Sequence, residues 1–208
     1  MKGLIRNNLY SASSGYKLMV LLAVLSGVAG IVLENGIFVT CYGIVVLILF
    51  PINTFSTVQV DTYANWSKYE ISLPVRRRDI ILSKYICYIL FQVIGIILIQ
   101  SYLWFFSKVY PNFGVREMLP LFYMGIGLSL GTAAIFYPLI YTLGIDKSEL
   151  LISVSLIIMC LIMAAATFLL EKIGVEYELS MKVFQGVAIV LLLLSYLITN
   201  QIYQKKEY

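Results

Sequence analysis

Uncharged, apolar runs occupy most of this 208-residue chain: five have at least 21 residues and a sixth has 16. A helix needs about 20 apolar residues to cross the hydrocarbon core of a bilayer, so each long run can span it. The backbone must satisfy its own hydrogen bonds there, which favours helices. The pattern predicts an all-α integral membrane protein with six transmembrane helices, at about residues 18–33, 36–60, 85–107, 118–143, 150–170 and 183–204.

The composition agrees with one transmembrane domain over residues 1–208. Hydrophobic residues make up 61% of the chain and charged residues 12%, whereas a soluble domain carries about 25% charged residues. The run at 18–33 is short for a span and lengthens if Lys17 snorkels to the interface. Apolar residues continue to Leu33 after a long charged lead, which disfavours a cleaved signal peptide.

The distribution of Lys and Arg predicts the orientation. With a cytoplasmic N-terminus, 11 of the 15 basic residues fall in cytoplasmic segments and four fall outside. Because cytoplasmic loops carry the excess of Lys and Arg, we expect a multi-pass protein of the cell membrane with both termini in the cytoplasm. The net charge of +4 then reflects topology and does not indicate a nucleic-acid partner.

Several function classes are disfavoured by what the sequence lacks. It has no His, its three Cys share no CxxC spacing, and it has no GxxxxGK[ST] loop to cradle ATP. No Asp, Glu, Lys or Arg lies in the middle of a span, which argues against a proton-coupled transporter or an ion channel. We therefore expect no catalytic residue, no metal and no cofactor on this chain.

Polar residues inside the spans are candidates for lining a transport path. Residues 53–59 fit either an internal cavity or the interfacial end of a helix, and the sequence leaves both interpretations open. The candidate path-lining residues are Asn53, Thr54, Thr57, Gln59 and Gln92. A GxxxG motif, Gly127 to Gly131, allows close helix approach, either within the bundle or at a dimer face.

Two segments are predicted to lie on the cytoplasmic side. Residues 1–17 fit an interfacial helix, because Ile5, Leu9, Ala12 and Tyr16 recur on one helical face. Residues 61–84 form the longest charged loop. An aromatic helix in this loop is predicted to end before Pro74, because the residue before proline avoids the α region.

The loop allows two interpretations. It can rest on lipid headgroups, since Trp and Tyr favour the interface and each basic residue near an anionic leaflet contributes about 1 kcal/mol. It can also present an exposed aromatic face to a protein partner. The residues expected to face inner-leaflet phosphates are Arg76, Arg77, Arg78 and Lys84.

Residues 72–85, SLPVRRRDIILSKY, resemble the signature that leads into the third span of membrane subunits of type-2 ABC exporters. In that family an acidic residue and a short helix come first, as Asp61 and the Trp66 to Tyr69 segment do here. Ile81 stands where Val is commoner. The six spans, the basic amphipathic N-terminus and the cytoplasmic termini extend the resemblance along the chain, which is similar to small Gram-positive exporters of peptides such as phenol-soluble modulins.

The resemblance implies a cytoplasmic coupling helix near residues 63–71 that docks in a cleft of a separate ABC ATPase, where ATP and Mg²⁺ would bind. The residues expected to contact that partner are Tyr63, Asn65, Trp66, Lys68, Tyr69, Glu70 and Leu73. It also implies a second permease chain, identical or paralogous, with the path between the two. The expected cargo is an amphipathic peptide or another hydrophobic molecule moved out of the cell, for export or for immunity.

Two rival interpretations belong to other classes. A non-transporting membrane scaffold or sensor subunit would share the same spans, and a neighbouring ATPase reading frame would separate it from a transporter. An intramembrane enzyme is disfavoured, because the sequence has no His, no buried acid pair and no GxSx-type nucleophile turn.

Overall fold

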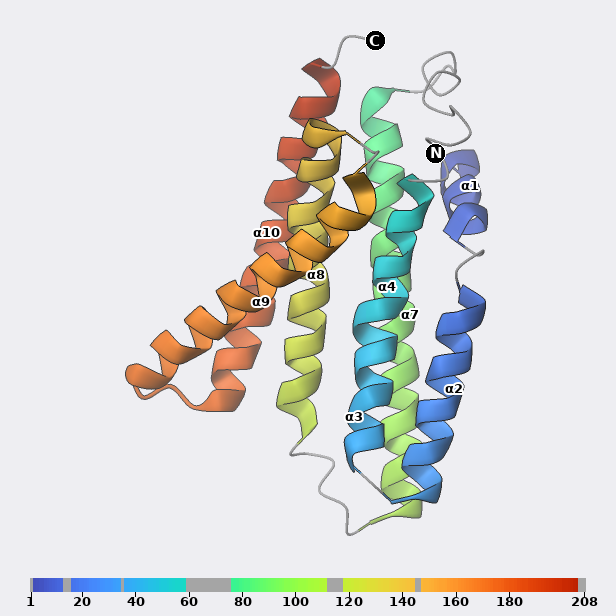
Figure 1. The fold of residues 1–208 in the computed structure, drawn as a ribbon, viewed down its shortest axis with the longest axis vertical. Helices are drawn as coiled ribbons and strands as arrows, with labels where there is room; N and C mark the ends of the chain where they lie inside the picture. The colour runs from blue at the N-terminus through green and yellow to red at the C-terminus, as the bar shows by residue number, and fades with distance from the viewer. Residues whose placement is uncertain are drawn as a thin grey trace.

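The computed structural model describes residues 2–12, 16–34, 36–58, 76–111, 118–144 and 147–205, and the regular elements within these ranges are helices. They are α1 (Lys2–Ala12), α2 (Tyr16–Val32), α3 (Gly36–Ile44), η1 (Val45–Leu49), α4 (Phe50–Ile52), η2 (Asn53–Phe55), α7 (Arg77–Val109), α8 (Leu119–Leu143), α9 (Ser148–Lys172) and α10 (Tyr177–Lys205). They form an elongated bundle (Figure 1). Helix α1 and the end of α10 lie at the same end, called here the terminal end.

The helices have the length and apolarity of membrane spans. Within the described ranges, five qualify: Gly36–Val58, Arg77–Val109, Leu119–Leu143, Ser148–Lys172 and Tyr177–Lys205. A sixth is counted if α1 and α2, bent by 62° from each other, are taken together. Helix α2 has 17 residues and a length of about 26 Å, slightly less than the bilayer core. The expected all-α integral membrane class is confirmed.

The second span is not a regular α-helix. It passes from α3 into the π-helical segment η1, then through the short α4 to the 3₁₀ turn η2. Pro51 lies in α4, where it cannot donate a backbone hydrogen bond. π-Helical turns are rare and often mark functional positions. The irregularity lies halfway along the span, beside α7.

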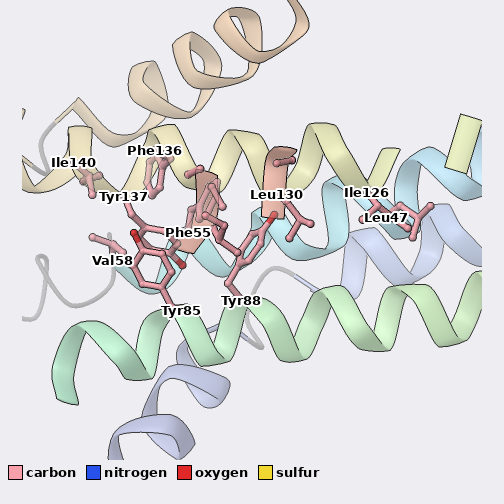
Figure 2. Close-up of a cluster of buried hydrophobic side chains, with 14 of the residues drawn as sticks. Leu47, Phe55, Val58, Tyr85, Tyr88, Ile126, Leu130, Phe136, Tyr137 and Ile140 are labelled. Atoms are coloured by element: carbon pink, nitrogen blue, oxygen red, sulfur yellow. The ribbon is translucent and has the colours of Figure 1, made fainter. Parts of the chain in front are cut away.

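The core of the bundle is aromatic at the terminal end. Figure 2 shows the rings of Phe55, Tyr85, Tyr88 and Tyr137 gathered between the second span, α7 and α8. Phe55 stacks on Phe136 with ring centroids 4.0 Å apart, and Tyr85 lies 4.4 Å from Tyr137. Aromatic pairs of this kind contribute about 0.5–1.5 kcal/mol beyond the area they bury. This cluster ties together three spans.

Both glycines of the GxxxG motif contact neighbouring helices of the same chain. A Cβ on Gly127 would lie 2.6 Å from the ring of Phe184 in α10, and a Cβ on Gly131 would collide with Met159 in α9. Of the two interpretations of the motif, packing within the bundle or a dimer face, the structure therefore shows packing within the bundle. Helix α9 then diverges strongly from α8 (Figure 1).

Helix α1 packs on the beginning of α7. Leu4, Asn8 and Ala12 are buried, and the Asn8 amide donates to the Ser83 hydroxyl at 3.0 Å. In the expected apolar stripe, Ile5 and Leu9 are only half-buried. The buried face thus shares Ala12 with the expected stripe but contains Leu4 and Asn8 in place of Ile5 and Leu9, because a polar side chain with a partner on α7 can be buried there.

Candidate functional site

The residues expected to contact an ATPase all lie outside the described residues. They are Tyr63, Asn65, Trp66, Lys68, Tyr69, Glu70 and Leu73. The aromatic coupling segment therefore stays a prediction, and so does its cytoplasmic location. The next described residue is Arg76, immediately before α7 begins.

Three arginines lie at the start of α7 and are exposed. Arg76 is the N-cap residue, in an extended conformation, and Arg77 and Arg78 follow in the first turn. Cations are unfavourable at the positive end of a helix dipole, by about 0.3–1 kcal/mol each. Asp79 in the same turn offsets part of this cost, and Arg77 Nη1 donates to the Gln204 carbonyl at the end of α10 (3.3 Å). The cluster thus sits at the surface of the terminal end.

Lys84 differs from the three arginines. Only 5% of it is exposed, and the Tyr137 hydroxyl donates to its backbone carbonyl over a long 3.4 Å. A buried ammonium group is costly unless it is paired or reaches the interface. The side chain lies within the bundle, away from the exposed position that Arg76–Arg78 share.

The candidate path-lining residues of the second span face the bundle. Thr54 and Thr57 are buried, and their hydroxyls donate to the carbonyls of Pro51 and Thr54, each at 2.7 Å. Asn53 is half-buried, and its Nδ2 has no hydrogen-bond partner among the described residues. Gln59 lies outside the described residues. A path along this segment stays a prediction.

Gln92, the candidate from the third span, belongs to a buried network. Its Nε2 donates to the Leu47 carbonyl of η1 over a long 3.4 Å, and its Oε1 accepts from the Ser129 hydroxyl at 2.8 Å. The Tyr88 hydroxyl donates to the Ser129 carbonyl at 2.6 Å. A network with its members satisfied rigidifies the helices that carry it. Gln92 therefore joins α7 to η1 and to α8.

Similar bonds connect α7 to other helices along its length. The Tyr85 hydroxyl bonds to Ser195 at 2.7 Å and to Thr199 at 3.0 Å, both on α10. Near the other end, Tyr102 donates to the Gly27 carbonyl of α2 at 3.1 Å. With Ser83 to α1 and Gln92 to η1 and α8, side-chain hydrogen bonds join α7 to five other elements.

The far end of α7 is also tied to the end of α2. The Tyr110 hydroxyl donates to the Ile31 carbonyl at 2.7 Å. Desolvation, followed by the neighbouring Glu34 carboxylate, raises the pKa of this hydroxyl above its ordinary value near 10. Tyr110 therefore stays protonated, and able to donate this bond, throughout the physiological pH range.

Sequence reasoning missed the hydrogen-bonding roles of Tyr85, Tyr88 and Ser129, although Tyr85 is the last residue of the family signature. Each lies in an apolar run, where a tyrosine or serine gives no periodic signal and reads as ordinary packing. The one available signal was that a buried tyrosine hydroxyl needs a partner. The partner could not be named, because Ser129 is 41 residues from Tyr88 along the chain.

The polar groups of the site are mostly uncharged. Among the described residues, the buried polar side chains other than Lys84 are amides, hydroxyls and the thiol of Cys87, and no group of three His, Cys, Asp or Glu could hold a metal ion. Neutral hydrogen bonds between helices position them without supplying an acid, a base or a nucleophile. Fold and site together define a multi-pass, all-α membrane protein in which side-chain hydrogen bonds join α7 to five other helical elements.

The particular family follows from comparison with family models. The model described as ABC-2 family transporter protein matches residues 3–204, nearly the whole chain. The chain belongs to this family: it is a membrane-spanning transport permease, a type of subunit that works with an ABC ATPase and is not itself the ATPase. Comparisons with curated proteins and with solved structures gave no match.

Proposed function

We propose that this chain is the permease of an ATP-driven exporter that moves amphipathic peptides or other hydrophobic cargo out of the cell. Two permease chains, identical or paralogous, would form the path. ATP and Mg²⁺ would bind on the separate ATPase, and the loop at residues 61–84 would dock into it from the cytoplasm. Family membership supports the general role, and the uncharged interior of the spans favours cargo that is itself largely apolar.

The single observation that carries the proposal is the bonding of α7. This helix begins at Arg77, just after the undescribed residues 59–75, so that residues 77–84 of the predicted loop form its first turns. Its 33 residues reach about 50 Å. Hydrogen bonds join it to α1, α2, η1, α8 and α10. A push on the loop would therefore displace α7 as a rod and move the helices bonded to it.

The loop would supply the docking contact. Trp66 and Tyr69 would fill apolar pockets in the ATPase cleft, since buried aromatic side chains contribute most strongly to protein interfaces. Lys68 and Glu70 would pair with charges at the rim. Arg76–Arg78, exposed where α7 begins, would lie at inner-leaflet phosphates and hold the loop at the membrane surface.

The experiment compares two double variants in a strain that expresses the chain together with its ATPase. Trp66→Ala with Tyr69→Ala removes the proposed anchors. Trp104→Ala with Tyr177→Ala removes the same two residue types from exposed positions elsewhere on the bundle. We expect the first variant to lose at least tenfold in peptide export and in the ATPase that co-purifies, with no change in its own expression. The second should retain both.

The outcome separates an exporter from the rivals. Normal export by the Trp66/Tyr69 variant would refute the docking role. If an ATPase co-purifies with the chain but neither double variant changes peptide export, the scaffold or sensor subunit would be favoured.

A further inference from the structure

An apolar groove runs along one side of the bundle, between α2, the second span and α7. Its volume is about 390 Å³, and its walls include Val20, Val24 and Val28 of α2, Val45 and Val46 of η1, and Tyr102 of α7. The three valines of α2 are each at least half exposed. The groove therefore opens toward the membrane that surrounds the bundle.

Small residues and aromatic rings shape the groove. The ring of Tyr42 lies 3.2 Å from the position of a Cβ on Gly27, so the glycine lets this ring pack closely there. Tyr42 packs against Tyr102 in a tilted arrangement, with ring centroids 4.2 Å apart. Toward the terminal end, Phe50 lines the groove and packs on Tyr16, at 4.8 Å. Aromatic rings thus line the groove at two positions along its length: Tyr42 with Tyr102, and Phe50 nearer the terminal end.

The dimensions fit one extended hydrocarbon chain. From Val20 to Ile31 the groove follows 12 residues of α2, a rise of about 17 Å, close to half of a hydrocarbon core of about 30 Å. The volume spread over this length gives a cross-section of about 23 Å², far below that of a helix 10–12 Å in diameter. An acyl chain can lie in such a slot along its length, whereas a helix would insert only its side chains.

A cation lies at one end of the same helical face. Lys17 precedes Val20 by three residues and Val24 by seven, the spacing of one stripe, and it is exposed. It follows Tyr16, which packs at the terminal end of the groove. An apolar slot of one-leaflet length with a lysine at its end is complementary to a lipid with an acyl chain and an anionic headgroup.

We propose that this groove binds one acyl chain of an anionic phospholipid, whose phosphate pairs with Lys17. The bound chain contacts Val45 and Val46 and so supports the π-helical form of η1. The site does not depend on the proposed export function, because it needs neither ATPase nor cargo.

The test measures phospholipid retained by purified protein. The chain is reconstituted in vesicles of equal parts phosphatidylglycerol and phosphatidylcholine without any peptide, extracted in detergent, and examined by native mass spectrometry. Val24→Trp fills the groove. Leu25→Trp, its neighbour, adds the same ring to an exposed position that does not line the groove. Lys17→Gln removes only the surface charge.

We expect Val24→Trp to retain at least fivefold less phospholipid than wild type, and Leu25→Trp to match wild type. Lys17→Gln should keep the lipid and lose its preference for phosphatidylglycerol by about fivefold, as expected for one interfacial cation. Equal retention by the two tryptophan variants would overturn the site. An unchanged headgroup preference in Lys17→Gln would overturn the role of Lys17 without relying on a variant that alters packing.

The cargo is the alternative occupant. If an added amphipathic peptide displaces the retained lipid from wild type at equimolar concentration, the groove binds cargo and the proposal is wrong. Retention that the peptide leaves unchanged supports the phospholipid.

Discussion

At the scale of single residues, Gly95 sets the distance between α7 and the second span. A Cβ at this position would lie 2.7 Å from the carbonyl oxygen of Val46 in η1. The obstacle is backbone, which cannot move aside as a long side chain can. The close approach also lets Gln92 reach the Leu47 carbonyl. One glycine thus permits the contact between the irregular span and the helix proposed to transmit force.

Gly95→Ala should destabilise the protein by about 1–3 kcal/mol, because α7 and η1 must separate to admit the methyl group. The measurement is the apparent melting temperature in detergent. Gly186→Ala is the matched control: nothing lies within 4 Å of its Cβ position, so alanine should be neutral or stabilising by up to about 1 kcal/mol. Equal melting temperatures for the two variants would contradict the close approach.

At the scale of elements, α8 and α9 differ most strongly in how much of each helix is buried. In its most apolar window, α8 is 67% buried, and α9 is only 17% buried. Helix α9 contacts the bundle mainly through its first half, where Leu151, Ser155 and Met159 are buried. Its second half faces outward as it diverges from α8 (Figure 1). Hydropathy follows this difference, because the more exposed α9 has the higher mean hydropathy, 2.6 against 1.6 for α8.

Met159→Ala should cost about 2–5 kcal/mol, because it leaves a cavity beside Gly131 that the helices cannot fill. Leu161→Ala, at a position 65% exposed on the same helix, should change the free energy of unfolding by less than about 0.5 kcal/mol. Chemical denaturation in mixed micelles gives both values. A large effect at Leu161 would show that the outward face of α9 is covered in the protein as purified.

At the scale of the whole molecule, the ends of the bundle differ in charge. The exposed arginines 76–78 and the exposed Lys147 lie at the terminal end. The turn between α9 and α10 at the other end, with its flanks, carries Glu171, Glu176 and Glu178 beside Lys172 and Lys182. An excess of basic residues marks the cytoplasmic side. We infer that the terminal end faces the cytoplasm, which puts the loop of residues 61–84 within reach of an ATPase.

Cysteine labelling of intact cells tests this orientation. In a background where Cys41, Cys87 and Cys160 are replaced by alanine, Glu176→Cys should react with a membrane-impermeant maleimide, and Trp66→Cys should react only after the cells are permeabilised. Labelling of Trp66→Cys from outside would reverse the topology and end the docking proposal. Labelling of Arg78→Cys provides an independent reading from a described residue at the same end.

The sequence by itself determined the membrane class, the approximate spans and the family resemblance, because each depends on local composition or on a contiguous motif. A run of apolar residues must be buried in lipid or protein whatever its neighbours are. Predictions on residues 59–75 remain predictions, since the described structure does not include them.

Only the tertiary structure decided what the polar residues do. From sequence, Gln92 and Thr57 were both candidates for lining a path, and the structure gives their hydrogen-bond partners: Gln92 pairs with Ser129, and the Thr57 hydroxyl donates to its own helix. It also assigned Gly127 and Gly131 to contacts within the chain. The reason is physical: inside a membrane every helix face is apolar, so the choice of neighbour rests on side-chain shape and a few hydrogen bonds between residues far apart in sequence.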